Sequence, residues 1–407
     1  VNYNLDNPES FAISELGLDL QNINIVGSEI SINVNSLSGL TGYGVKIDRL
    51  QTKFFMGSGE LRLDQLKLLT PHSNLATNLK FTYDKGDWSD FENKVNISAK
   101  FNQSELSTTD LNHFYQEFGL NENLELSGNI NGTLNDFNFS DIKIYGIQRS
   151  DISGDIVFKQ VANSEQFELK TQNIDITTNY FDLKLLLPQL LGDNLPEALQ
   201  YMGNFSLRGQ TYLKAKDLEA ELAFRSAEGN GFFKLNFKDL NLVEKVKYKG
   251  YFKANKLNLG KLTQTETLGL SSFNIYINGK GFTPESLNTK VDGQIDAIGI
   301  NNYTYNDINI DGNLKYPLFD GKLESLDPNF QLDFEGLVDA SKNRNTYKFQ
   351  SDVKYADLYK LNLINKDSIS VFKGKFDIDL KANTLDDAVG KIKFTNFNYT
   401  NSYDTYN

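Results

Sequence analysis

The chain has 407 residues and a formal net charge of −12 at pH 7. No run of lysine or arginine forms a stripe along it, so its long-range field repels a phosphate backbone and we expect no nucleic-acid partner. The chain has no cysteine, which excludes a disulfide framework and a thiolate site.

Strand-forming residues dominate the apolar part of the composition. Apolar residues make up 39% of the chain, and Phe (29) and Tyr (20) far outnumber Trp (1) and Met (2). A chain of this length ordinarily divides into two or three globular domains, a limit that a repeat protein escapes. The sequence opens at Val1 without an initiator Met, a basic leader or a long apolar run. It is therefore interpreted as an interior stretch, with any membrane anchor outside it.

Strands are predicted from one end of the chain to the other, interrupted by four short apolar segments. Residues 1–109 form a strand-rich upstream part. Asp110 is then expected to cap a short helix that carries Leu111, Phe114, Tyr115 and Phe118 on one face and ends at Gly119. Similar segments follow at 181–191, 257–262 and 357–363, and each precedes a strand: 124–134, 205–215, 273–282 and 372–380.

These segments divide the chain into blocks of one small helix followed by several antiparallel strands. The predicted blocks after 1–109 are 110–181, 182–256, 257–356 and a partial 357–407, all within one continuous elongated module. The spacings are too irregular for a short-period solenoid.

Within the strands, apolar and polar residues alternate, which predicts one apolar and one wet face. Asn230-Gly231 and Asp320-Gly321 are predicted hairpin turns. Gly132, Gly209, Gly279 and Gly293 fall inside strand patterns and are interpreted as bends.

The predicted fold is therefore all-β: a stack of antiparallel strands curved into a U-shaped groove, with a few short amphipathic helices. On sequence alone, the apolar face is either sealed as a core or left open as a trough. Residues sharing the apolar parity are the candidate lipid-lining positions: Leu124, Leu126, Ile130, Leu134, Phe205, Leu207, Phe273, Ile275, Ile277, Ile295, Leu332, Phe334, Phe376, Ile378 and Leu380.

Catalytic and metal-binding patterns are weak. His72 and His113 lie in distant segments, and no nucleophile motif accompanies them. Asp307 to Gly312 imitates half a calcium loop, but Leu318 stands where the bidentate Glu belongs, so a strand explains it better. We expect no catalytic residue, no metal site and no cofactor, and hence no enzyme.

Several motifs, weak singly but ordered together, give the chain a family resemblance. They are Leu257-Asn258-Leu259-Gly260-Lys261-Leu262, Gly279-Lys280-Gly281-Phe282, Tyr303-Thr304-Tyr305-Asn306-Asp307-Ile308, Asp327-Pro328-Asn329-Phe330, Gly336-Leu337-Val338-Asp339 and Leu385-Asp386-Asp387-Ala388-Val389-Gly390-Lys391-Ile392. From about Leu111 to Tyr399 the chain resembles the TamB/AsmA-like family. Leu16-Gly17-Leu18 and the stretch from Leu61 to Ser73 are similar to the strand-rich region upstream in that family.

The resemblance implies a periplasmic protein of Gram-negative cells, tethered to the inner membrane and reaching toward a BamA-like outer-membrane barrel. It implies conduction of phospholipids between the two membranes along an apolar groove. The anchor and the segment that meets the barrel are expected outside this chain.

Two other functions stay open at this point. The first is an assembly factor for outer-membrane proteins, whose strand edges would pair with client strands. The second is a passive spacer with a closed core.

Overall fold

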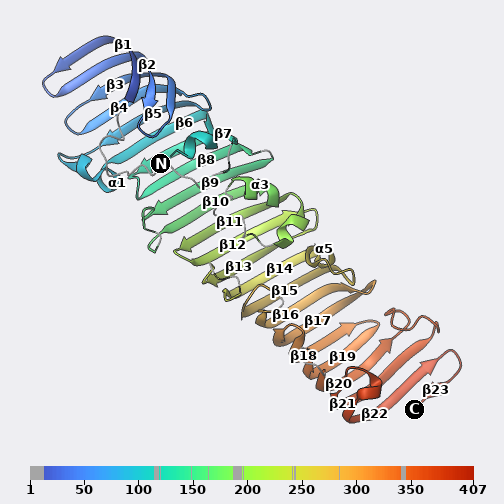
Figure 1. The fold of residues 1–407 in the computed structure, drawn as a ribbon. Coiled ribbons are helices and arrows are strands. Elements are labelled where there is room, and N and C mark those ends of the chain that lie inside the picture. The colour runs from blue at the N-terminus through green and yellow to red at the C-terminus, as the bar shows by residue number, and fades with distance from the viewer. Residues whose placement is uncertain are drawn as a thin grey trace. The chain divides into compact units, whose positions relative to one another are not determined.

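A computed structural model describes residues 13–407 except 114–118, 120, 148, 164, 187–194, 196, 241, 243, 284 and 341–344. It divides into two compact units, Val1–Ala215 and Lys216–Asn407. Both units are all-β and antiparallel, as predicted, with few and short helices (Figure 1).

In the first unit, strands follow one another in sequence order, and each strand from β2 to β10 is paired with the strand before it and the strand after it. Its strands are β1 Ile13–Val26, β2 Glu29–Thr41, β3 Lys46–Met56, β4 Glu60–Leu69, β5 Asn74–Thr82, β6 Asn96–Ser107, β7 Asn123–Gly132, β8 Phe137–Ile147, β9 Ser150–Lys159, β10 Glu168–Thr178 and β11 Phe205–Lys214. Its helices are η2 Asp87–Asp90, α1 Phe91–Lys94, α2 Thr108–Leu111, α3 Tyr180–Leu186 and η3 Glu197–Met202.

The second unit repeats this meander. Its strands are β12 Asp217–Ser226, β13 Gly229–Lys238, β14 Lys247–Asn258, β15 Leu268–Lys280, β16 Asn288–Ile300, β17 Tyr303–Lys315, β18 Leu318–Asp327, β19 Phe330–Asp339, β20 Thr346–Asp357, β21 Ser370–Lys381, β22 Val389–Asn401 and β23 Thr405–Tyr406. Its helices are α5 Leu259–Thr263 and η4 Leu385–Asp387.

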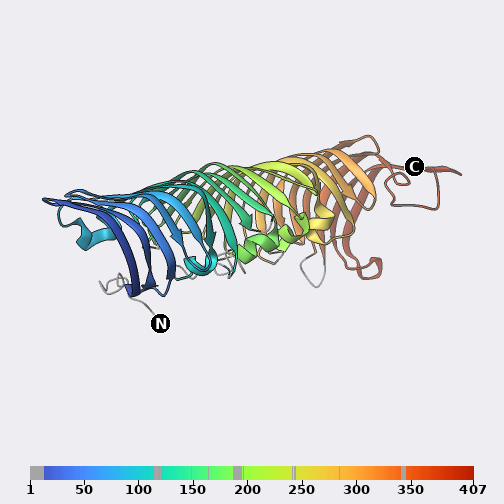
Figure 2. The same cartoon turned by 90° about the horizontal axis from the view of Figure 1, so that it is seen from above.

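Strands in both units bend along their length, which Figure 2 shows from above. Register shifts interrupt most pairings. Each bulge adds a residue to one strand and turns the chain. Residues with positive φ recur inside these strands: Gln65, Gln103, Asp141, Asn173, Lys256, Asp307 and Asn396. The curvature expected from the sequence is therefore present, and polar residues produce much of it.

Two predicted turns are wrong. Asn230-Gly231 lies inside β13, and Asp320-Gly321 lies inside β18. A Cβ added at Gly231 would stand 2.6 Å from the Phe224 ring, so glycine makes room there for a neighbouring ring. The real turns fall at residues 227–228 and 316–317.

The four apolar segments follow β6, β10, β14 and β20. In an uninterrupted antiparallel meander, all even-numbered strands end on the same side of the sheet. Both segments of a unit therefore lie along the side formed by these strand ends, and they are called edge segments below.

The helix predicted at 110 is the short α2, but its cap is Ser107, whose side chain accepts from the Thr109 amide. Asp110 is instead buried inside the turn. The ring positions expected at 114–118 lie outside the described residues. The segment at 357–363 forms turns rather than a helix.

Each of these edge segments is bonded to an earlier turn of its own unit. The His113 Nδ1 atom lies 3.0 Å from the Tyr43 carbonyl oxygen, and the Asp182 carboxylate accepts from the Arg149 amide at 3.3 Å. In the second unit, α5 is held to the β12–β13 turn, and the segment after β20 is held to the β16–β17 turn. The edge segments therefore run back over strands that precede them.

Candidate functional site: the apolar face of the second unit

Strand register arranges the apolar residues of the second unit into rows that cross the sheet. Three neighbouring rows run across β15 to β21. Row A contains Phe273, Ile295, Ile308, Ser325, Leu332, Val353 and Gly374. Row B contains Ile275, Gly293, Ile310, Leu323, Phe334, Ser351 and Phe376. Row C contains Ile277, Val291, Gly312, Gly321, Gly336, Phe349 and Ile378.

Row A is largely sealed. Val353 is buried together with Ala356 and Leu361, and the partly buried rings of Tyr305, Phe330 and other residues pack against them. Leu361 belongs to the segment after β20, and it is 1% exposed. This edge segment therefore closes the face over row A.

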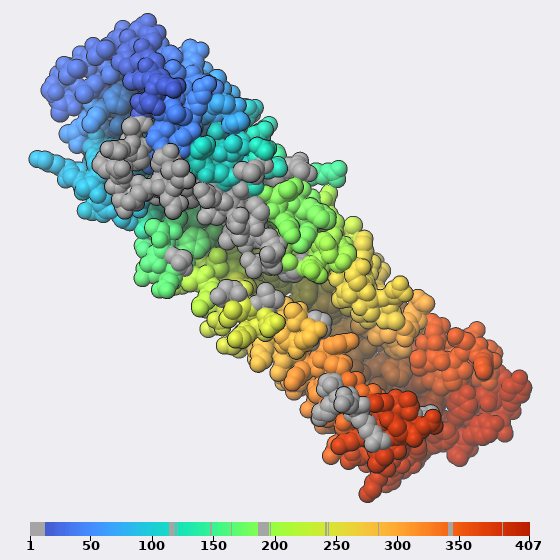
Figure 3. All heavy atoms as spheres, viewed as in Figure 1, coloured from blue at the N-terminus to red at the C-terminus, as the bar shows by residue number. Residues whose placement is uncertain are grey.

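Rows B and C remain accessible. Every residue of row B is only half-buried, from Ile275 to Phe376, and so are all residues of row C except Gly312. The space-filling view shows the second unit hollowed between its two rows of strand ends (Figure 3). The apolar face thus combines a sealed margin with an open centre.

Row C contains three consecutive glycines, Gly312, Gly321 and Gly336, which lie beside phenylalanine residues of β18 to β20. A Cβ at Gly312 would meet the Phe319 ring at 2.7 Å, and one at Gly336 would meet the Phe349 Cβ atom at 2.7 Å. The rings of Phe319, Phe334 and Phe349 form a chain with centroid spacings of 6.1 and 5.0 Å. The missing side chains let the rings lie against the sheet, which leaves a smooth aromatic floor.

Nine of the predicted lining residues belong to this unit, and eight of them lie in rows A, B and C. Row A holds Phe273, Ile295 and Leu332, row B holds Ile275, Phe334 and Phe376, and row C holds Ile277 and Ile378. Leu380 lies one position further along β21 and is paired with Tyr347. Phe273 is buried, and the others are half-buried.

In the first unit, cross-strand pairing continues from Leu126 through Ile144, Ile152 and Ile176 to Leu207. Ile130 and Leu207 are half-buried, whereas the remaining predicted strand positions are sealed: Leu124, Leu126 and Phe205. Leu134 was expected on the same face, but this is wrong. It lies in the turn after β7 and is exposed, because the Thr133 amide bonds to the Asp136 carbonyl and ends the strand.

Sequence reasoning missed Ile310, Leu323 and Phe349, which lie between predicted positions. Their parity within β17, β18 and β20 was the available signal. Bulges conceal it, because the register shift in β20 places Val353 and Ala356 on the same side although their numbers differ in parity.

A polar cluster at the margin fixes the end of row A. The buried Asp327 carboxylate accepts from the Tyr303 hydroxyl at 2.6 Å, the Asn306 amide at 3.0 Å and the Asn329 amide at 2.8 Å. Burial, followed by this bond to Asp327, raises the pKa of Tyr303 to about 12. Burial also raises the pKa of Tyr305, with a smaller contribution from Asp327. Both phenols therefore stay neutral and act as packing groups.

A hollow of about 970 Å³ is lined by residues of β15 to β22, and its lining includes six members of row B: Gly293, Ile310, Leu323, Phe334, Ser351 and Phe376. Two rows of polar side chains flank it, and its charged lining residues are Asp292, Asp311, Lys322, Glu324, Asp333, Glu335, Asp352, Lys375, Asp377 and Lys393. The row B residues lie between these polar rows in the lining, so the hollow borders the candidate site.

No group of histidine, cysteine or carboxylate side chains within the described residues is placed to hold a metal ion. Asp307 to Gly312, the half calcium loop of the sequence, lies within strand β17. None of the helices that the structure describes is long and apolar enough to cross a membrane.

Comparison with known proteins gives no relative: no family model, no curated protein and no solved structure matches the chain.

Proposed function

We propose that the chain shields lipid acyl chains on rows B and C and conducts phospholipids between the inner and outer membranes of a Gram-negative envelope. The observation that carries the proposal is the difference between row A, which is buried except at Ile295 and Leu332, and rows B and C, which are half-buried except at Gly312. A structural spacer gains nothing from leaving an aromatic floor in contact with water. The resemblance to TamB/AsmA-like proteins supports the periplasmic setting and the remote partners, an inner-membrane anchor and a BamA-like barrel.

Burial on this floor provides enough free energy to hold a lipid. An acyl chain of about sixteen carbons gains on the order of 10 kcal/mol, at ~0.8 kcal/mol per buried methylene, before ordering costs. Rows B and C each contribute one residue on every strand from β15 to β21. The glycines among them are Gly293 in row B and Gly312, Gly321 and Gly336 in row C. Because the binding surface is repeated from strand to strand, a chain can shift along it without one deep barrier. No residue needs to react, and head groups stay at the wet margin.

Matched substitutions on the two faces of β19 test the proposal. Phe334→Lys places a charge in row B, whereas Glu335→Lys places the same side chain on the polar face. Lipid recovered by organic extraction and mass spectrometry from the purified protein should fall several-fold in Phe334→Lys and stay unchanged in Glu335→Lys. Equal lipid content in both variants would contradict the proposal.

A photo-crosslinker at Leu323 or Phe349 distinguishes lipid conduction from assembly of outer-membrane proteins. Lipid adducts support conduction. Polypeptide adducts without lipid support the assembly factor, and no adduct at either position supports the passive spacer.

A further inference from the structure

The polar face of the second unit separates its charges into bands. The three adjacent strands β13, β14 and β15 carry seven lysines and no carboxylate: Lys234, Lys238, Lys247, Lys249, Lys253, Lys256 and Lys280. This basic band occurs in a chain whose net charge is −12. It was not visible in the sequence, because no single strand contains a run of lysines.

The next four strands, β16 to β19, have the opposite charge. Their exposed or half-exposed charged residues are the carboxylates Asp292, Asp296, Asp307, Asp311, Asp320, Glu324, Asp333 and Glu335, against the lysines Lys290, Lys315 and Lys322. Many of these carboxylates line the 970 Å³ hollow. An acidic band with a depression therefore adjoins a basic band on one face.

Several of these charges have no opposite partner in their own chain. Within the described residues, Lys249 and Lys253 make no ion pair, and neither do Asp292 and Asp320. Others are paired within their band or with a neighbour, as Lys290 is with Asp311 at 3.2 Å and Lys322 with Glu335 at 3.1 Å. The unpaired charges are thus available to a second molecule.

The basic band also exposes aromatic rings. Tyr251 is 58% exposed and Phe232 38% exposed. Tyr251 packs edge-on against Tyr276 of β15, with the ring centroids 5.0 Å apart. Aromatic side chains are enriched at protein interfaces relative to the rest of the surface.

We propose that this face binds a second copy of the chain in a two-fold dimer, with the basic band of each copy against the acidic band of the other. A two-fold axis parallel to the strands, between β15 and β16, lays β13 to β15 over the partner's β16 to β18. Both contacts are then attractive, and the projecting lysines and Tyr251 meet the acidic hollow.

A self-complementary partner fits the bands better than a planar polyanion does. A membrane or nucleic-acid surface large enough to cover the basic band would also lie over the acidic band, whose strands begin about 5 Å away, well within a Debye length. Such a surface is attracted by the basic band and repelled by the acidic band. A second copy of the chain is attracted by both bands.

The size of the contact predicts a weak dimer. Six strands at about 4.8 Å spacing and about 17 Å of strand length cover roughly 500 Å² per copy. A total near 1,000 Å² lies at the lower limit for specific interfaces, so association in the micromolar range is expected. Salt should weaken it by about tenfold or more between about 50 mM and about 500 mM NaCl, because the contact is mainly between exposed charges.

Charge reversal tests the geometry by sedimentation velocity on the full chain. Lys249→Glu/Lys253→Glu lowers the basic band from seven positive charges to a net of three, and Asp292→Lys/Asp320→Lys lowers the acidic band from a net of five negative charges to one. Each variant should therefore dimerise at least about tenfold more weakly than the unaltered chain, because the attraction between exposed charges is reduced. An equimolar mixture of the two variants should form the heterodimer in preference to either homodimer, because one of its two contacts joins an unaltered basic band to an unaltered acidic band. Lys143→Glu/Lys170→Glu, which changes two strand lysines of the first unit by the same charge, should dimerise like the unaltered chain.

Circular dichroism of each variant verifies that it is folded. The result of the mixture can then be interpreted, because both components are folded on their own. Three results would overturn the proposal. One is an unaltered chain that stays monomeric at about 50 mM NaCl and several hundred micromolar protein. The second is a dimer that neither charge reversal weakens, and the third is a mixture that associates no more tightly than each variant alone. If the unaltered chain is monomeric but floats with anionic phosphatidylglycerol vesicles and not with phosphatidylcholine ones, the band binds membranes instead.

Discussion

The side-chain amide of Asn362 donates a hydrogen bond over 3.3 Å to the backbone carbonyl of Asn301, which lies 61 residues earlier in the chain. This bond holds the segment after β20 against the turn between β16 and β17. Leu361, the residue before Asn362, is consequently pressed onto Val353 and Ala356 and closes row A. This edge segment thus seals the part of row A that lies on β19 and β20.

Replacing Leu361 by alanine should destabilise the second unit by about 2–5 kcal/mol, because it removes a fully buried side chain and leaves a cavity. Leu363, two residues further and 57% exposed, is the matched control. Its alanine variant should change stability by no more than about 0.5 kcal/mol. Urea unfolding followed by circular dichroism measures both. Equal losses would show that Leu361 does not seal the face.

The fold class followed from the sequence because alternation within strands is a local property. Apolar–polar alternation alone identified Leu126, Phe334 and Ile378 as strand residues. The structure places them in β7, β19 and β21. The turns were not predictable in the same way. Asn230-Gly231 has the composition of a tight turn, yet Gly231 is needed beneath the Phe224 ring of the neighbouring strand.

The boundary between sealed and open rows was also beyond the sequence. It depends on Leu361 reaching strands that precede it by many residues, and no local pattern encodes that contact. The basic band was hidden for a similar reason. Lys234, Lys249 and Lys280 are distant in sequence and become neighbours only through the register of β13 to β15.

Tyr303 should titrate above the other tyrosines. Burial and the bond to Asp327 raise its pKa from 10.0 to about 12. Since the folded-state pKa is the higher one, the associated stability is fully present below pH 10 and is lost as pH rises through about 12. The difference in tyrosinate absorbance between the unaltered chain and Tyr303→Phe should therefore rise near pH 12. A difference curve centred near pH 10 would contradict the assignment.

Asp327→Asn should lower the pKa of Tyr303, because it removes the negative charge that opposes ionisation of the phenol. It should also destabilise the fold by about 1–3 kcal/mol, since the buried site receives hydrogen bonds from three residues and an amide can accept fewer of them. The same absorbance titration and urea unfolding measure the two effects. Asp320→Asn, at an exposed position of the same strand, should change neither.

Gly336→Ala tests the aromatic floor. Gly336 has φ of +143°, and a Cβ there would stand 2.4 Å from the Lys348 carbonyl oxygen and 2.5 Å from the Phe349 Cα atom. The substitution should cost about 3 kcal/mol or more, because both backbone strain and a collision with β20 oppose it. Gly27→Ala, where φ is +61° and nothing lies within 4 Å, isolates the strain alone. It should cost only about 1–2 kcal/mol in thermal or urea unfolding. Equal costs would mean that the close approach of β19 and β20 at Gly336 is unimportant.

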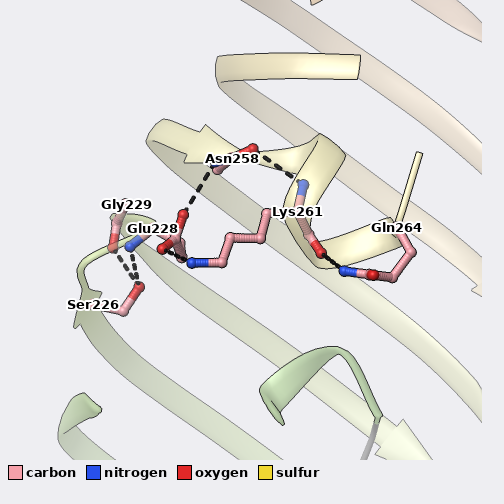
Figure 4. Close-up of polar contacts among 6 residues, drawn as sticks. All are labelled: Ser226, Glu228, Gly229, Asn258, Lys261 and Gln264. Carbon is pink, nitrogen blue, oxygen red and sulfur yellow. Dashed lines mark hydrogen bonds and ion pairs between the residues drawn. The ribbon is translucent and has the colours of Figure 1, made fainter. Parts of the chain in front are cut away.

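The attachment of α5 gives the last prediction (Figure 4). The Glu228 carboxylate, on the turn between β12 and β13, accepts from the Asn258 side-chain amide at 3.1 Å and pairs with the Lys261 ammonium group. The Asn258 side-chain Oδ1 atom in turn caps α5 by accepting from the Lys261 backbone amide at 3.1 Å. Glu228→Ala removes both side-chain bonds to the turn but leaves the cap and the bond of 2.8 Å from the Asn258 backbone amide to the Glu228 carbonyl oxygen, so α5 should stay formed yet open more often. Hydrogen exchange should accelerate severalfold in residues 259–268 and remain unchanged in β18 to β21, because those strands are paired independently of this edge segment.

Lys253→Ala, which removes a lysine without an ion pair on β14, is the control and should leave hydrogen exchange at α5 unaltered. Unchanged exchange in Glu228→Ala would show that α5 is held by packing rather than by this carboxylate.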